Sequence, residues 1–140
     1  MAPGVAHILL AFGASIFGVL GGLHLAYTFF SHKLLPRDPA VIDAMKSTSL
    51  VLTRQTTVWD AWIGFNASHS LGAILFAVFY ILLAVQHPQV LVQSTSFALL
   101  GVATGAAYLW LAHAYWFRVP FLSIAIATAC FIGAFALLAL

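Results

Sequence analysis

Three polar side chains that could do chemistry lie inside long apolar stretches of this sequence: His24, Asn66 and His69. An imidazole can donate or accept a hydrogen bond, bind a metal or haem iron, or move a proton near neutral pH. A carboxamide adds donors and an acceptor. Because polar groups in membrane helices are costly and usually face the bundle interior, these three residues are the first candidates for a functional site.

The surrounding composition is that of an integral membrane protein. Of 140 residues, 64% are hydrophobic and only 6% are charged, against about 25% charged in ordinary soluble domains. A helix needs about 20 apolar residues to cross about 30 Å of hydrocarbon. Four such runs are present, near 6–30, 61–85, 90–116 and 119–140. We therefore predict an all-α protein, an up-down-up-down four-helix membrane bundle forming a single domain over 1–140.

The basic residues predict the orientation of these helices. They are Lys33, Arg37, Lys46, Arg54 and Arg118. The first four lie between the first and second runs and the fifth lies between the third and fourth, so all share one side, which the positive-inside rule makes cytoplasmic. We predict a multi-pass protein of the inner membrane with both termini outside. The first 23 residues lack Lys and Arg, so we expect the first run to stay a helix rather than serve as a cleaved signal peptide.

The long connection 31–56 predicts a short helix at the cytoplasmic interface, over about 39–52. Asp38 is a good N-cap, and Pro39 suits the first helical turn. An apolar face is supplied by Val41, Ile42, Met45, Leu50 and Leu52. Such a helix could be a plain connector or a lid over a site beneath it.

Small residues predict where helices approach closely. Ala14, Gly18 and Gly22 recur at every fourth position of the first run, and Gly101 and Gly105 form a GxxxG motif on the third. Such faces allow close backbone contact. They predict either a compact bundle or a homo-oligomer contact.

If neighbouring helices are antiparallel, His24, Asn66 and His69 lie at one depth in the membrane. Asn66 and His69 lie six and nine residues beyond Asp60, which places them about 9–13 Å below the start of the second helix. His24 lies about 9 Å from the cytoplasmic end of the first helix. We expect these side chains to form one layer inside the bundle.

Aromatic residues near the same boundary extend the candidate site. Trp59 and Trp62 share a helical stripe with Asn66 and His69, at spacings of three and four. These aromatic residues could form an interfacial belt or wall a pocket. His113 is closer to the interface and is about 120° from the GxxxG face, which favours a structural role. The predicted ligand-binding residues are His24, Trp62, Asn66, His69, Tyr27, Trp59 and His113.

Several chemistries could use this layer. The leading hypothesis is a pocket for a small hydrophobic molecule or cofactor, in which His and Asn bind one polar group and aromatic rings hold an apolar body. A b-type haem between His24 and His69 is an alternative. So is a metal held by His24, His69 and His113, although no carboxylate, thiolate or HxxxH spacing joins them. Whether any reaction is catalysed is left open.

Other functional classes are excluded or disfavoured by the sequence. Cys130 is the only cysteine, so an intramolecular disulfide cannot form. The net charge of +2 is explained by membrane topology rather than by nucleic-acid binding. A rival hypothesis is an accessory or structural subunit of a larger membrane complex, redox-active or haem-containing, in which the polar residues are interhelical contacts.

Three short motifs resemble those of a known group: GLH at 22–24, PAVIDAM at 39–45 and WIGF at 62–65. The first half of the chain is similar to small, uncharacterised four-helix membrane proteins of bacteria. The resemblance implies the same architecture in a bacterial inner membrane but no activity. It draws attention, without assigning roles, to Gly22, His24, Pro39, Met45, Trp62, Gly64 and Phe65.

Overall fold

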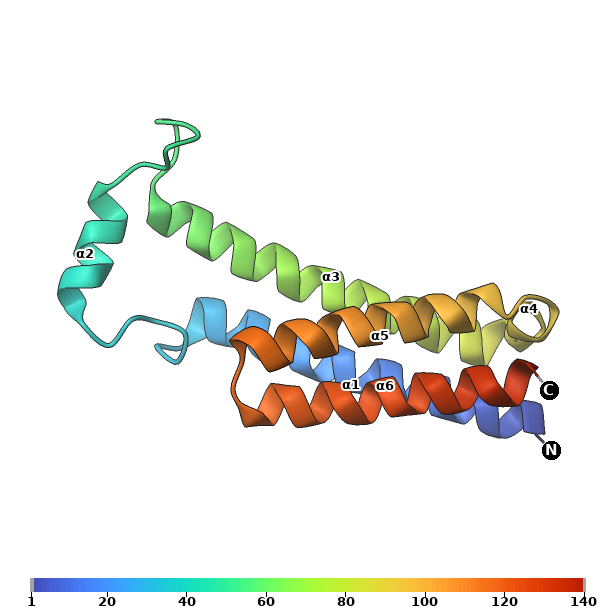
Figure 1. The fold of residues 1–140 in the computed structure, drawn as a ribbon. Coiled ribbons are helices and arrows are strands. Elements are labelled where there is room, and N and C mark those ends of the chain that lie inside the picture. The colour runs from blue at the N-terminus through green and yellow to red at the C-terminus, as the bar shows by residue number, and fades with distance from the viewer. Residues whose placement is uncertain (1, 140) are drawn as a thin grey trace. The chain divides into compact units, whose positions relative to one another are not determined.

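The computed structural model describes residues 2–139, and this part of the chain is helical without a regular strand (Figure 1). The helices are α1 (Ala2–Phe30), α2 (Pro39–Ser47), α3 (Val58–Gln86), α4 (Pro88–Gln93), α5 (Ser96–Tyr115) and α6 (Arg118–Ala139). Four of them, α1, α3, α5 and α6, are long and apolar enough to cross a membrane. The predicted all-α four-helix fold is confirmed, and by length and composition the chain is a small multi-pass membrane protein.

The connecting helix α2 begins where the sequence predicts but ends earlier. The backbone N–H of Ala40 donates to the Asp38 carboxylate at 2.9 Å, and Pro39 occupies the first turn. The helix stops at Ser47 because Thr48 has an extended backbone, with φ −108° and ψ 131°. Residues 48–52 therefore lie outside the helix that was predicted over 39–52.

The third apolar run is not one helix. The short helix α4 covers Pro88–Gln93, and α5 begins only at Ser96. Ser94 has an extended backbone, with φ −142° and ψ 105°, which interrupts the predicted helix over 90–116. The membrane-spanning part is therefore the 20 residues of α5.

The chain divides into two compact units. Unit 1 contains the chain up to Leu20 and from Ala73 onward, and unit 2 is Gly21–Gly72. Unit 1 thus holds the first part of α1, the second part of α3, and α4, α5 and α6. Unit 2 holds the end of α1, the connection with α2, and the start of α3.

Unit 1 is organised around buried and partly buried aromatic rings from all four long helices. Phe131 of α6 is fully buried, and its ring centre lies 5.8 Å from that of Phe76 and 5.7 Å from that of Tyr80. Phe17 packs edge-to-face against Tyr108 at 5.3 Å. Such offset and edge-to-face pairs are the preferred aromatic geometries. Successive long segments of unit 1 run in opposite directions in Figure 1, as predicted for an up-down-up-down bundle.

The GxxxG motif of α5 packs within this bundle. A Cβ added at Gly105 would lie 2.9 Å from the Thr128 hydroxyl and 3.3 Å from the Phe131 ring, and one at Gly101 would lie 3.4 Å from Phe131. These glycines therefore allow α6 to approach α5 closely. The sequence predicted either a compact bundle or a homo-oligomer contact for this face. In the structure the face packs against α6 of the same chain.

The small residues of α1 differ in their surroundings. Ala14 is fully buried, and a Cβ at Gly18 would lie 3.1 Å from the Ala77 side chain, so both serve packing inside unit 1. Gly22, in unit 2, has no neighbouring atom within 4 Å of where a Cβ would be. The predicted face is thus a packing surface up to Gly18 and open at Gly22.

Candidate functional site

The central contact of unit 2 is a hydrogen bond between two helices. The Nε2 atom of His24, on α1, lies 2.8 Å from the Oδ1 atom of Asn66, on α3. Asn66 is only 6% exposed, and His24 is half-buried. Both residues sit within apolar helices, where a polar side chain needs a partner to offset its lost hydration. The pairing expected from their common depth is present.

The hydrogen bonds of Asn66 define which nitrogen of His24 carries a proton. The Asn66 side-chain amide donates through Nδ2 to the backbone carbonyl of Trp62 at 2.7 Å. Its Oδ1 atom therefore faces His24, and only a protonated Nε2 can donate to it. In the neutral ring, Nδ1 is then the acceptor nitrogen. The opposite amide orientation would set two carbonyl oxygens against each other.

His69 completes a pair of imidazoles. Its ring centre lies 5.6 Å from that of His24, with the ring planes at 68°, an edge-to-face arrangement. The His69 ring also has an apolar neighbour. The Phe65 ring lies nearly parallel to it, with ring centres 6.2 Å apart and ring planes at 16°. His24, Asn66 and His69, which we call the polar cluster, are therefore brought together within unit 2.

Two hydroxyl groups bond to the backbone at this cluster. Thr28 Oγ1 donates to the carbonyl of His24, and Ser70 Oγ donates to the carbonyl of Asn66, each at 2.8 Å. Ser70 is fully buried and was not among the predicted residues. Its position four residues after Asn66, on the same helical face, was the available signal.

The predicted aromatic residues have other contacts. The Lys46 ammonium of α2 lies 5.1 Å from the ring centre of Trp59, and the Lys33 ammonium lies 4.4 Å from that of Tyr27. Trp62 is 38% exposed, and its backbone carbonyl, rather than its ring, bonds to Asn66. Cation–π contacts of this kind suit aromatic side chains at a membrane boundary.

His113 belongs to unit 1, whereas the polar cluster belongs to unit 2. It is exposed at the end of α5, and its ring centre lies 5.7 Å from that of Phe121. Among residues 2–139 there is no group of three or more His, Cys, Asp or Glu side chains that could hold a metal ion. The contacts of His113 agree with a structural role.

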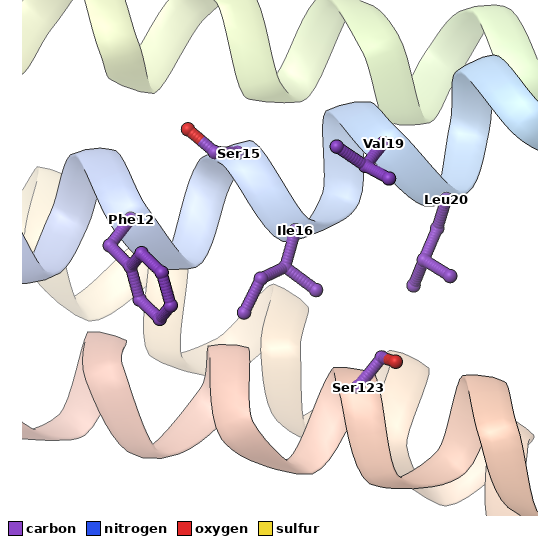
Figure 2. A pocket seen from close by; sticks show the side chains of 6 residues that line it. All are labelled: Phe12, Ser15, Ile16, Val19, Leu20 and Ser123. Carbon is purple, nitrogen blue, oxygen red and sulfur yellow. The ribbon is translucent and has the colours of Figure 1, made fainter.

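A shallow apolar groove of about 300 Å³ lies in unit 1, between α1 and α6. Figure 2 shows Phe12, Ile16 and Leu20 of α1 directed toward α6, where Ser123 points back. The Ser15 hydroxyl at its edge already donates to the carbonyl of Ala11 at 2.8 Å. None of the predicted site residues lines this groove, and its walls suit a lipid acyl chain rather than a polar ligand.

His7 lies near the start of α1. Its side chain is half-buried, and its Nε2 atom is buried with no hydrogen-bond partner in the part of the chain that the structure describes. A single buried nitrogen is a polar group without compensation rather than a site.

No family model, curated protein or solved structure matches this chain.

Proposed function

We propose that unit 2 binds a small lipid-soluble molecule whose single polar group is held by the polar cluster. The observation that carries this proposal is the 2.8 Å hydrogen bond between His24 and Asn66, because it joins α1 and α3 through two polar side chains inside apolar helices. Imidazole and carboxamide groups are the hydrogen-bonding partners that a single hydroxyl or carbonyl group of such a molecule needs. The apolar faces of the helices would hold the rest of the molecule.

The geometry favours a small polar group over a haem. Two histidines that ligate one haem stand on opposite faces of the macrocycle, with the iron between them. The rings of His24 and His69 instead form an edge-to-face pair with centres 5.6 Å apart. That distance is typical of two aromatic rings in direct contact.

The distribution of charge supports a cytoplasmic position for the site. Lys33, Arg37, Lys46 and Arg54 all lie on the connection between α1 and α3. Under the positive-inside rule this connection faces the cytoplasm, in a bacterial inner membrane with both termini outside. The polar cluster would then lie in the cytoplasmic half of the bilayer.

The test is the amount of small molecule that the full chain retains after gentle purification. His69→Phe keeps an aromatic ring against Phe65 and leaves the bond between His24 and Asn66 intact, so it removes one ligand contact with little effect on the fold. We expect extraction and mass spectrometry to show at least a tenfold loss of bound molecule, the effect of about 1.4 kcal/mol. His24→Leu should have the same effect.

His113→Leu is the matched control, because His113 is exposed and lies in unit 1. It should retain the molecule at the wild-type level. Equal occupancy in the wild type and in His69→Phe, or no bound molecule in either, would contradict the proposal.

A second candidate function is that of an accessory subunit of a larger membrane complex. The observation that favours it is a set of glycines in unit 2, Gly22, Gly64 and Gly72, with no atom within 4 Å of an added Cβ. Open glycines on membrane helices suit close contact with another helix. A stable monomer in mild detergent, with the same size in wild type and Gly64→Ile, would count against this role.

A further inference from the structure

The segment between α2 and α3 is an ordered loop with a closed base. Ser49 and Thr57 form an antiparallel bridge, and the backbone N–H of Val58 donates to the carbonyl of Thr48 at 2.8 Å. Within the loop, the N–H of Gln55 donates to the Thr53 hydroxyl at 3.1 Å. We call residues 48–57 the 48–57 loop. The bridge and these hydrogen bonds hold the loop in a defined conformation.

This loop exposes two apolar side chains at its tip. Val51 is 109% exposed and Leu52 is 91% exposed, so almost no atom of the protein covers them. Leu50 is partly covered, and the flanking positions are polar. Exposed apolar side chains are unfavourable in water, and a loop that presents two of them together indicates that another apolar phase receives them.

The position of the loop indicates which phase that is. Its base is followed directly by α3, which begins at Val58 and is a candidate membrane span. The five residues that follow Leu52, up to Thr57, span at most about 18 Å when extended. Figure 1 shows the loop, between α2 and α3 in the colour series, turned to the side of α3 that faces away from the end of α1. The tip is therefore held beside a membrane helix near its point of entry.

The charge beside the tip matches a lipid surface. Arg54 is exposed two residues after Leu52, and the 48–57 loop contains no acidic residue. Basic side chains near a bilayer are attracted to anionic headgroups, and apolar side chains beside them can enter the boundary between headgroups and acyl chains.

We propose that the 48–57 loop is an anchor in the interface of the bilayer that the chain spans. Val51 and Leu52 insert at the boundary between headgroups and acyl chains, and Arg54 contacts the phosphate of an anionic phospholipid. The loop contains none of the residues of the polar cluster, so this proposal does not depend on ligand binding.

The experiment places a fluorophore at the tip in the full chain. Cys130→Ala removes the only native thiol, and Leu52→Cys then carries an environment-sensitive nitrobenzoxadiazole label in vesicles of phosphatidylcholine and phosphatidylglycerol. We expect blue-shifted emission, quenching by a lipid with its spin label near the headgroup, and a several-fold smaller quenching constant for aqueous iodide than at Gln55→Cys. Gln55 is the matched control because it is an exposed polar residue of the same loop.

Two outcomes would overturn the anchor. Equal iodide quenching at positions 52 and 55 would mean that the tip stays in water. Protection from iodide without quenching by the spin-labelled lipid would mean that a protein surface, from a second copy or a partner, covers the tip. Arg54→Gln should reduce the blue shift in phosphatidylglycerol vesicles and leave it unchanged in pure phosphatidylcholine; an identical response to both lipids would remove the assigned role of Arg54.

Discussion

Units 1 and 2 hold their helices together by different means. In unit 1, α5 and α6 meet at glycines, and the Phe131 ring is surrounded by other aromatic rings. In unit 2, α1 and α3 meet through the hydrogen bond from His24 to Asn66 and through the rings of His24 and His69, and Lys46 on the Trp59 ring connects α2 to α3. Lipid tails are as apolar as Leu, so membrane helices associate through close packing or through polar bonds. Close packing predominates in unit 1, where the Tyr80 hydroxyl also donates to the Phe97 carbonyl of α5 at 2.7 Å, and polar contacts predominate in unit 2.

The difference indicates where chemistry is feasible. A tightly interlocked core has little space for a ligand and transmits strain when its side chains change. Unit 2 leaves Gly22, Gly64 and Gly72 without close neighbours and contains the polar cluster. The unit with these open glycines is therefore the one that also carries the candidate site.

The largest expected effect is that of Gly105→Val in unit 1. Its Cβ would lie 2.9 Å from the Thr128 hydroxyl and 3.4 Å from the Thr128 Cα, so α5 and α6 must separate. Overpacking of this kind costs about 1–3 kcal/mol. Unfolding in mixed micelles with a denaturing detergent measures the loss.

Gly64→Val in unit 2 is the matched control, because no atom lies within 4 Å of its added Cβ. Its free energy of unfolding should change by a few tenths of a kcal/mol, the scale of helix propensities. If both variants lose the same stability, the proposed difference in packing between the units is wrong.

A smaller effect is expected from Thr57→Ala, which removes the cap of α3. The Thr57 hydroxyl accepts from the backbone N–H of Asp60 at 3.1 Å and donates to the Asp60 carboxylate at 2.7 Å. Loss of such a cap costs about 1 kcal/mol. Hydrogen exchange should accelerate at the first-turn amides of α3, and not at those of α5.

Thr56→Ala is the control for this change, since the Thr56 hydroxyl makes a long hydrogen bond, at 3.5 Å to the Thr57 carbonyl. Equal acceleration in the two variants would show that Thr57 does not act as a cap.

The smallest expected effect is the coupling between His24 and Asn66. A double-mutant cycle with His24→Leu and Asn66→Leu isolates their pairwise contribution to stability. Side-chain hydrogen bonds between membrane helices contribute about 0.6 kcal/mol on average, with a maximum of about 1.7 kcal/mol. We expect a coupling energy in that range from unfolding in mixed micelles. Strictly additive single variants would mean that this bond does not hold unit 2 together.

The sequence predicts the spans and the start of α2 because these depend on local signals. Apolar length determines a membrane helix, and Asp38 with Pro39 is a local cap. The break at Ser94 has no Gly or Pro to mark it, so a hydropathy pattern reads through it. The sequence also did not predict which side chains are buried in unit 1, because its helices are apolar on all sides. Periodicity therefore does not distinguish Tyr80, which is 1% exposed, from its neighbours.

The candidate site was predictable where depth and helical face agree. His24 and Asn66 meet because antiparallel helices bring them to the same depth. That depth can be counted in the sequence from the end of each helix. The contacts of the aromatic rings were not predictable in this way. They depend on the conformations of flexible lysine side chains, such as that of Lys46 over the Trp59 ring. Ligand binding by the seven predicted residues stays a prediction.

The hydroxyl and amide groups around the polar cluster leave a spectroscopic mark on the backbone. The carbonyls of His24, Trp62 and Asn66 each accept a side-chain bond in addition to the bond of the helix itself. A carbonyl that accepts two hydrogen bonds has a weakened C=O stretch. Isotope-labelled carbonyls at these three positions should therefore absorb at lower infrared frequency than one in the apolar stretch of α6. The cluster could then be followed in a native membrane without attaching a foreign chemical group.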